Sequence, residues 1–170
     1  MKLFSNSFAG ALVLMAIFSG AVLAQGTSVP FGITHHDSTK PIEITADSFS
    51  VSQNEGQAEF VGNVVAGQAE MRLTADKMVV EYDSKQDQKT GKIARMFATG
   101  HVTLVSGAEA AEAEKAIYSI KKANITLIGN VLLTQGQNAL SGQKMLIDLK
   151  SGSARILGRV KTIFKAGGSK

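Results

Sequence analysis

Leu73-Thr74-Ala75-Asp76-Lys77-Met78-Val79-Val80 is the fullest copy of a phrase that recurs along this chain. Its Ala-Asp step returns as Ala46-Asp47, as Ala113-Glu114 and, altered, as Gly142-Gln143. The four copies are spaced 29, 38 and 29 residues apart. A period held this closely is typical of a stacked architecture, in which each unit buries an apolar face against its neighbours.

A second phrase follows the first one in each unit and consists of a glycine, a polar or basic residue and a valine. The two phrases start 16 residues apart in three units and 25 apart in the second unit. The nine extra residues fall in or near the polar run 83–91, where we expect an inserted loop. Glycine within strand-like sequence indicates a corner where side-chain bulk is not tolerated. The four copies are Gly62-Asn63-Val64, Gly100-His101-Val102, Gly129-Asn130-Val131 and Gly158-Arg159-Val160.

Apolar and polar residues alternate on both sides of the Ala-Asp step, as they do in half-buried β-strands. Ile42 and Ile44 carry the apolar positions before the first step. Phe49 and Val51 carry them after it, so the alternation slips by one residue. A continuous strand keeps its apolar side chains on one face, and the slip therefore predicts a bend or a bulge. We expect about four short strands per unit, about 16 in all, folded into two facing sheets.

Equivalent positions in the four units form columns that are entirely apolar or aromatic. Stacking the units therefore predicts continuous apolar ladders on one side of the sheets and mixed charge on the other side. The columns are Ile44, Leu73, Ala111 and Leu140; Phe49, Met78, Ala116 and Met145; Val51, Val80, Tyr118 and Ile147; and Val64, Val102, Val131 and Val160.

Residues 1–24 have the features of a cleaved secretory signal peptide. Lys2 gives a positive start, the apolar run Phe8–Phe18 is about 11 residues long, and small residues precede Ala24. The run is shorter than the ~20 residues of a membrane-spanning helix, although an uncleaved anchor is the alternative. After the signal peptide we expect a flexible leader at 25–39, a β-domain at 40–164 and a flexible tail at 165–170.

The composition excludes several classes of protein. The chain has no cysteine, which excludes a disulfide scaffold and thiolate metal ligands. Its formal net charge of +4 is too small to indicate nucleic acid as a partner. From Lys144 onward there are seven basic residues and one acidic residue, Asp148. This basic end either favours an anionic partner or serves as a solubilising tail.

The polar residues form no catalytic constellation. Asp47 and Asp76 occupy the same slot of the repeat, where hydrogen bonds to local backbone explain them better than acid–base chemistry. His101 occupies a slot that Asn or Arg fills elsewhere, and the adjacent His35 and His36 lack further metal ligands. There is no cysteine nucleophile, serine–histidine arrangement or glycine-rich phosphate loop. We expect a protein that is not an enzyme and that uses no metal or cofactor.

Four stretches, in their order and spacing, resemble the OstA-like family over about residues 38–164. The chain departs from the family pattern at Gly142-Gln143 and in its third unit, which is rich in alanine and glutamate. The four stretches are Lys40-Pro41-Ile42-Glu43-Ile44-Thr45-Ala46-Asp47, Phe60-Val61-Gly62-Asn63-Val64, Leu73-Thr74-Ala75-Asp76-Lys77-Met78-Val79-Val80 and Leu127-Ile128-Gly129-Asn130-Val131.

The resemblance implies an all-β, open, twisted β-jellyroll whose two sheets enclose an apolar groove. It also implies a periplasmic lipopolysaccharide-binding transport protein, which shields the acyl chains of lipid A and bridges the inner to the outer membrane in lipopolysaccharide export and outer-membrane assembly. Shielding is needed because each methylene buried from water gains ~0.8 kcal/mol. We expect the groove to be lined by Ile42, Ile44, Phe49, Val51, Val64, Leu73, Met78, Val80, Tyr82, Val102, Leu104, Tyr118, Ile120, Val131, Leu133, Met145, Ile147 and Leu149.

An open stack of strands leaves an unpaired edge at each end, and such edges invite pairing with another chain. By resemblance, we expect the edge at Ile42–Thr45 to bind an inner-membrane-anchored LptC-like protein. The end at Arg155–Phe164 is expected to bind an outer-membrane LptD-like translocon or the next copy of the chain. Head-to-tail contacts between identical chains do not close, so short filaments follow from them.

Two other classes of protein fit the same sequence. One is an inner-membrane-anchored relative in the same transport system, which would keep its N-terminal helix. The other is a structural β-repeat protein, which would fill its interior tightly and bind no lipid. A mature chain that begins at Gln25 distinguishes the exported carrier from the anchored relative.

Overall fold

The computed structural model describes residues 27–31, 36–85 and 88–164. These residues form eleven β-strands and no helix, which confirms the all-β expectation. The expected signal peptide and C-terminal tail lie outside the described residues. The strands are β1 (Thr27–Pro30), β2 (Glu43–Thr45), β3 (Ser48–Ser52), β4 (Gln57–Gln68), β5 (Met71–Lys85), β6 (Gln88–Ser106), β7 (Glu109–Ser119), β8 (Asn124–Gln135), β9 (Asn138–Asp148), β10 (Ser153–Leu157) and β11 (Lys161–Ile163).

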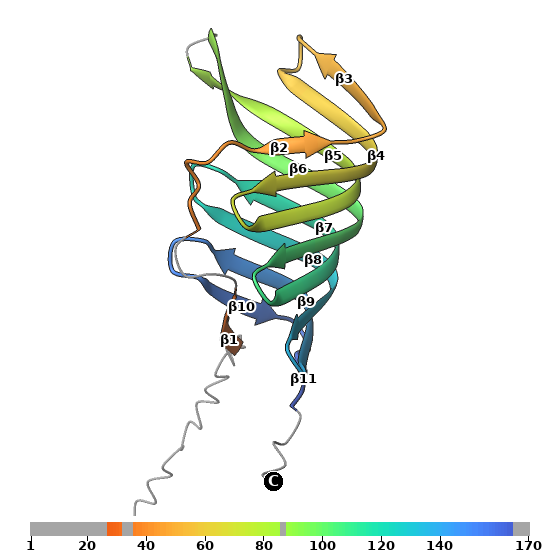
Figure 1. The fold of residues 1–170 in the computed structure, drawn as a ribbon, viewed down its shortest axis with the longest axis vertical. Helices are drawn as coiled ribbons and strands as arrows, with labels where there is room; N and C mark the ends of the chain where they lie inside the picture. The colour runs from red at the N-terminus through yellow and green to blue at the C-terminus, as the bar shows by residue number, and fades with distance from the viewer. Residues whose placement is uncertain (1–26, 32–35, 86–87, 165–170) are drawn as a thin grey trace, which may run out of the picture.

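All eleven strands belong to one antiparallel sheet that folds over on itself (Figure 1). The long strands β4 to β9 bend at a common line, which we call the corner, and each gives one segment to each of two facing layers. β2 and β11 extend the first layer. β3, β10 and β1 extend the second layer. The architecture is therefore the expected open, twisted jellyroll.

The number of strands differs from the expected number of about 16, because there are eleven. The sequence pattern treats the two segments of a bent strand as separate strands. In the structure the same two strands pair on both sides of the corner, with only a bulge between, so β4 to β9 each continue as one strand. The two facing sheets that the sequence predicts are likewise two layers of one continuous sheet.

The corner is built from the two recurring phrases. Strand pairing is interrupted there in each neighbouring pair, for example between Val61 and Val64 in β4 and between Thr99 and Val102 in β6. This irregularity confirms the bulge that the slip in alternation predicts. The four glycines of the second phrase have positive φ angles between 78° and 85°. Only glycine adopts such angles without strain, which explains its return in every unit.

An acidic side chain packs against three of these glycines and contacts the residue that follows each of them. Asn63 Nδ2 donates to Asp47 Oδ2 over 2.8 Å in the first unit. The same contact recurs in the next two units, as His101 Nδ1 with Asp76 Oδ2 at 2.8 Å and as Asn130 Nδ2 with Glu114 Oε1 at 2.6 Å. The carboxylates thus bind side chains of the neighbouring strand rather than the expected local backbone. The bulge explains this difference, because it turns those side chains along the corner.

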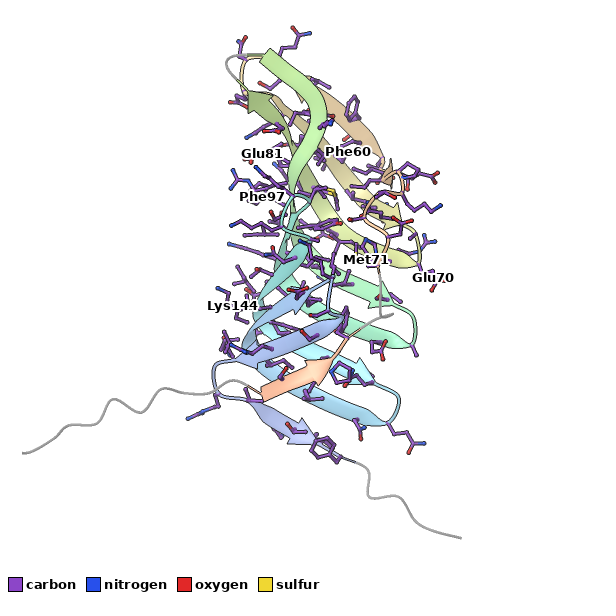
Figure 2. All side chains as sticks on the ribbon, turned by 90° about the vertical axis from the view of Figure 1, so that its left-hand side faces the viewer. Phe60, Glu70, Met71, Glu81, Phe97 and Lys144 are labelled. Carbon is purple, nitrogen blue, oxygen red and sulfur yellow. The ribbon has the colours of Figure 1, made fainter. Side chains whose placement is uncertain are left out.

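Apolar side chains from both layers fill the space between them. Figure 2 shows Phe60 and Met71 between the two layers, whereas Glu81 and Lys144 point away from the interior. The inward-facing core residues are at most 6% exposed. Their alternation with polar residues places one face of every strand inside and the other face in water.

The stretch 25–39, expected to be a flexible leader, contains β1, which lies at the opposite end of the sheet from β2 (Figure 1). β1 pairs antiparallel with β10, where Val29 lies opposite Ala154. Phe31, which follows β1, is only 2% exposed. Val29 and Phe31 form an apolar pair around Pro30, and a pair is too short to show the period by which strands are found in a sequence.

The run 83–91, expected to be an inserted loop, instead lengthens the hairpin of β5 and β6. β5 extends to Lys85 and β6 begins at Gln88, and these two residues pair. Figure 1 shows this hairpin projecting beyond the neighbouring strands. A projecting hairpin has no layer to pack against, which accounts for its polar sequence.

Candidate functional site

The candidate site is the apolar interior between the two layers. Of the 18 residues that the sequence predicts for a groove, sixteen contribute to this interior. Phe49 and Val51 are instead 59% and 55% exposed, because β3 is the last strand of its layer. Ile42, Ile44, Tyr82 and Ile120 are partly buried against the core. The fully buried ones are Val64, Leu73, Met78, Val80, Val102, Leu104, Tyr118, Val131, Leu133, Met145, Ile147 and Leu149.

Other interior residues were not among the predicted groove residues. Leu127, Leu140 and Ile156 are buried and stand at repeating positions. Leu140 already belongs to one of the apolar columns, and the same period points to the other two. Met96 is buried as well, but it follows the insertion in the second unit, which disturbs the spacing. Phe31 belongs to no repeat and carries no such signal.

The interior is closed in this structure. Leu104, Leu127 and Leu133 have no exposed surface, since side chains of the facing layers pack against one another. Every buried side-chain nitrogen or oxygen among the described residues has a hydrogen-bond partner. The interior therefore offers dispersion and hydrophobic contact but, among the described residues, no unpaired polar group, and an apolar ligand has to separate the layers to enter.

Opposite the corner, the ends of the long strands bring the layers together along a line that we call the mouth. Gln68 and Ser106 lie at the mouth on the first layer and are 4% and 8% exposed. Tyr82, Ile93 and Ile120 lie there on the second layer and are partly buried. The mouth therefore combines buried polar groups on one side with apolar groups on the other.

Gln68 joins both layers and the segment that precedes β2. Tyr118 Oη, from the second layer, donates to Gln68 Oε1 over 2.7 Å. Gln68 Nε2 donates to the carbonyl oxygens of Ser38 and Lys40 over 3.0 and 2.9 Å. His36 Nε2 lies 3.1 Å from Gln68 Oε1. One buried amide thus fastens residues 36–40 across the mouth.

Burial raises the pKa of Tyr118 to about 12. The ordinary pKa of tyrosine is near 10, so the phenol keeps its proton throughout the neutral range. The hydroxyl therefore remains a hydrogen-bond donor to Gln68 under those conditions.

A hollow of about 480 Å³ lies at the mouth near β2. Partly buried isoleucines line it from both layers, namely Ile42, Ile93 and Ile120. Lys40 and Lys92 line the same hollow and are exposed. Apolar groups beside cationic groups suit an amphiphilic ligand that carries negative charge.

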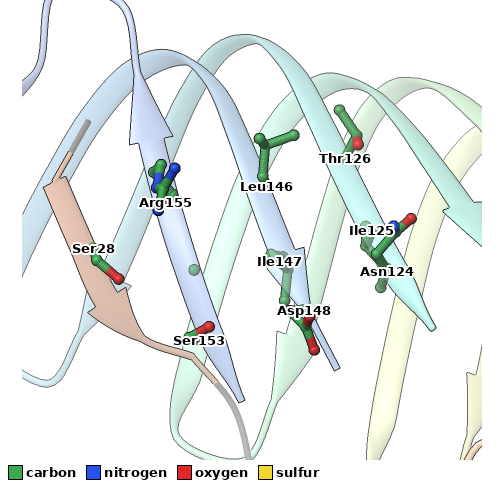
Figure 3. A pocket seen from close by; sticks show the side chains of 10 residues that line it. Ser28, Asn124, Ile125, Thr126, Leu146, Ile147, Asp148, Ser153 and Arg155 are labelled. Carbon is green, nitrogen blue, oxygen red and sulfur yellow. The ribbon is translucent and has the colours of Figure 1, made fainter. Parts of the chain in front are cut away.

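A second hollow, of about 350 Å³, lies on the second layer across β1, β10, β9 and β8 (Figure 3). Its lining includes the polar residues Asn124, Asp148, Ser153 and Arg155. Hydrogen bonds from the amides of Ser151 and Lys150 lower the pKa of the Asp148 carboxyl. This polar lining does not suit an acyl chain, so we do not assign the hollow to the apolar site.

The outer surface carries charged pairs instead of apolar ladders. Lys77 Nζ lies 2.7 Å from Glu59 Oε2, and Arg95 Nη2 lies 2.7 Å from Glu81 Oε2. Within the described part of the chain, no group of three or more His, Cys, Asp or Glu side chains could hold a metal ion. Nor do the described residues include a helix that is long and apolar enough to cross a membrane.

Comparisons with known proteins agree with this architecture. The crystal structure of LptH from Pseudomonas aeruginosa, described as the LptA-homologous periplasmic component of the conserved lipopolysaccharide transport device, matches with a TM-score of 0.67. The match covers 78% of this chain and 100% of LptH at 18% identity, which shows a shared fold. No curated protein matches the sequence. The sequence model of one family matches residues 43–153, which is the greater part of the chain. The chain therefore belongs to the LptA/(LptD N-terminal domain) LPS transport protein family.

Proposed function

We propose that this chain is a periplasmic carrier that holds the acyl chains of lipid A between its two layers and passes lipopolysaccharide along its length. The observation that carries the proposal is the unbroken apolar ladder across the sheet. Val80, Met96, Tyr118, Ile125 and Ile147 lie opposite one another on five successive strands. None of the five side chains is more than 2% exposed, so the ladder is continuous inside the molecule.

The ladder suits movement of a lipid rather than capture at one point. Each methylene that leaves water contributes ~0.8 kcal/mol, so several acyl chains need continuous shielding. Successive strands offer similar apolar surfaces and, among the described residues, no unpaired buried polar group, so no single position should hold the lipid much more tightly than its neighbours. The carrier is not an enzyme in this proposal, and the direction of transport comes from its partners.

The mouth is the proposed route by which the acyl chains enter. Separation there breaks the hydrogen bonds of Gln68 and the apolar packing between the layers, whereas separation at the corner would break the sheet itself. Lys40 and Lys92 lie beside the hollow at the mouth. Their charge suits the anionic headgroup of lipopolysaccharide, which stays in water while the acyl chains enter.

We propose a protein partner for each of the two ends of the sheet. β2 and β3 form the N-terminal end, which we assign to an inner-membrane-anchored LptC-like protein. β10 and β11 form the C-terminal end, which we assign to the next copy or to an outer-membrane LptD-like translocon. Exposed sheet edges pair with strands of other chains, and among the described residues β2, β3 and β11 each present one.

Photo-crosslinking tests the proposal within a single strand. A crosslinker in place of Val80, which faces the interior from β5, is expected to capture lipopolysaccharide in cells. The matched control is a crosslinker at Lys77, which lies on the same strand and pairs with Glu59 on the outer surface. Equal capture at both positions, or capture at neither, would rule out the interior as the lipid site. Failure at both positions would favour the structural β-repeat protein.

A further inference from the structure

The edge that the proposed function assigns to a next copy is already occupied by the chain's own β1. We propose that β1 is an intramolecular cap on β10, and that a second copy of this chain joins the C-terminal end only after the cap is displaced. The inference rests on the proposed head-to-tail assembly, which the capped structure would hold back.

The cap is held by several contacts. β1 pairs along its whole length with β10, from Thr27 opposite Ile156 to Pro30 opposite Ser153. Phe31 is buried, and its amide donates to the carbonyl of Gly152 over 2.9 Å. Gln135 Nε2 donates to the carbonyl of Pro30 over 2.6 Å. Figure 3 shows β1 alongside β10, which leaves β10 no free edge for another strand.

The two ends of the sheet match each other in layer and in length. In the second layer, β3 at one end and β10 at the other end each have five residues. In the first layer, β2 and β11 each have three residues. Strand direction alternates through the antiparallel sheet, so β3 of an incoming copy would lie antiparallel to β10, as β1 does now. The surface therefore fits a second copy of this chain.

The exposed apolar side chains of β3 support this occupant. Phe49 and Val51 lie opposite Phe60 and Ala58 at the N-terminal end of two interior ladders. At the C-terminal end these ladders finish on β10, and Ala154 is covered by Val29 of the cap. A docked β3 would continue both ladders from one copy into the next. It would also bury the most exposed apolar side chains of the N-terminal end.

Charge also distinguishes the two ends. Glu43 and Asp47 are exposed beside the free edges of β2 and β3. Arg155 and Lys161 are exposed on β10 and β11. Opposite charges favour approach of one end to the other and make the association depend on salt concentration.

The cap leaves the edge of β11 uncovered, and an incoming copy can bind there first. β1 covers four of the five residues of β10 and does not pair with β11. No strand in the described part of the chain pairs with the outer edge of β11, and Ile163 is 56% exposed there. An incoming β2 can therefore pair with β11 first, after which β3 replaces β1 on β10.

A disulfide lock tests the cap because the chain has no cysteine of its own. Ser28 and Arg155 lie opposite each other on β1 and β10, and both are exposed. The double variant Ser28→Cys with Arg155→Cys is expected to be monomeric in sedimentation velocity when oxidised and to assemble when reduced. The control Leu146→Cys with Arg155→Cys links β9 to β10 and is expected to assemble in both states.

A second variant releases the cap without a disulfide. Val29→Asp places a charge opposite buried Ala154, and it is expected to lower the concentration needed for assembly by about tenfold, since a larger fraction of the chains becomes competent. Its thermal unfolding should stay close to that of the unchanged protein.

If the oxidised lock assembles as readily as the reduced form, or its disulfide joins two chains, the proposal of a cap is wrong, but the proposal of head-to-tail assembly is not affected. If the Val29→Asp protein and the reduced lock remain monomeric at all concentrations, head-to-tail assembly fails and the cap fails with it.

Discussion

Along the corner the same contact recurs from strand to strand, whereas at the mouth each contact occurs once. The corner repeats a positive-φ glycine under an acidic side chain, with Gly62 and Asp47 as one instance and Gly100 and Asp76 as the next. The mouth depends on Gln68, whose partners come from two separate parts of the chain, residues 36–40 and Tyr118. Repetition therefore stabilises the corner in three of the four units, and the loss of a single group can release part of the mouth.

This difference gives the two lines separate roles. The corner is continuous backbone with side-chain contacts between adjacent strands, so it keeps the layers joined. The contacts of Gln68 instead link residues 28 to 50 positions apart in the sequence. They can break without disturbing any strand pairing. This difference supports the proposed entry of acyl chains at the mouth, with the corner as the line that stays joined.

The largest effect is expected from a substitution in the corner, Gly100→Ala. The φ of Gly100 is 78°, and a Cβ there would collide with the Asp76 carboxylate. Strain and collision together should lower the free energy of unfolding by roughly 3 kcal/mol, measured by urea denaturation. Gly67→Ala on β4 is the matched control, since a Cβ there meets nothing within 4 Å. Equal losses in both variants would show that the corner glycines have no special role.

A pH titration addresses the mouth and should give the next largest effect. Burial raises the pKa of Tyr118 to about 12 in the folded protein, above its value of ~10 in the unfolded chain. The stability that this shift contributes is full below pH ~10 and is lost as the pH rises toward 12. The loss amounts to roughly 2–3 kcal/mol over that window. Tyr118→Phe should lose less stability than the unchanged protein between these pH values. Parallel pH profiles would show that Tyr118 is not confined in the folded state.

The repeat predicted the corner well, because each structural requirement there recurs. The slip in alternation around Ala75-Asp76 and the glycine of the second phrase were enough to place the bulges and the inward faces of the strands. The expected number of strands was wrong because the pattern cannot show that pairing with the same neighbour resumes beyond a bulge. The groove residues Phe49 and Val51 were placed in an interior that β3, as the last strand, does not enclose.

The mouth and the cap could not be predicted from the period. Gln68 is a single polar residue at the end of β4. Its role depends on Ser38 and Tyr118, which come close to it only in the folded chain. Val29 and Phe31 are two apolar residues beside a proline, and their partner β10 follows more than 120 residues later in the sequence. Unique long-range contacts of this kind have no repeated copy with which a sequence pattern can be compared.

The smallest effect is expected from Gln68→Leu. This variant tests whether the mouth can loosen while the corner does not. The leucine keeps the volume but leaves the Tyr118 hydroxyl without its acceptor, which should cost roughly 1–2 kcal/mol of unfolding free energy. Amides at residues 36–42 should exchange hydrogen faster, because Ser38 and Lys40 lose their fastening to β4. Amides at the corner should exchange at unchanged rates.

The control for this variant is Gln57→Leu, on the same strand. The side-chain amide of Gln57 donates to Glu81 over 3.4 Å, and this hydrogen bond involves neither residues 36–40 nor Tyr118. It should change neither set of exchange rates. If Gln68→Leu accelerates exchange at the corner as much as at residues 36–42, the layers loosen as one body and the mouth is not a separate opening. If only residues 36–42 respond, lipopolysaccharide should also load faster into the Gln68→Leu protein, because the group that closes the mouth is the one that was removed.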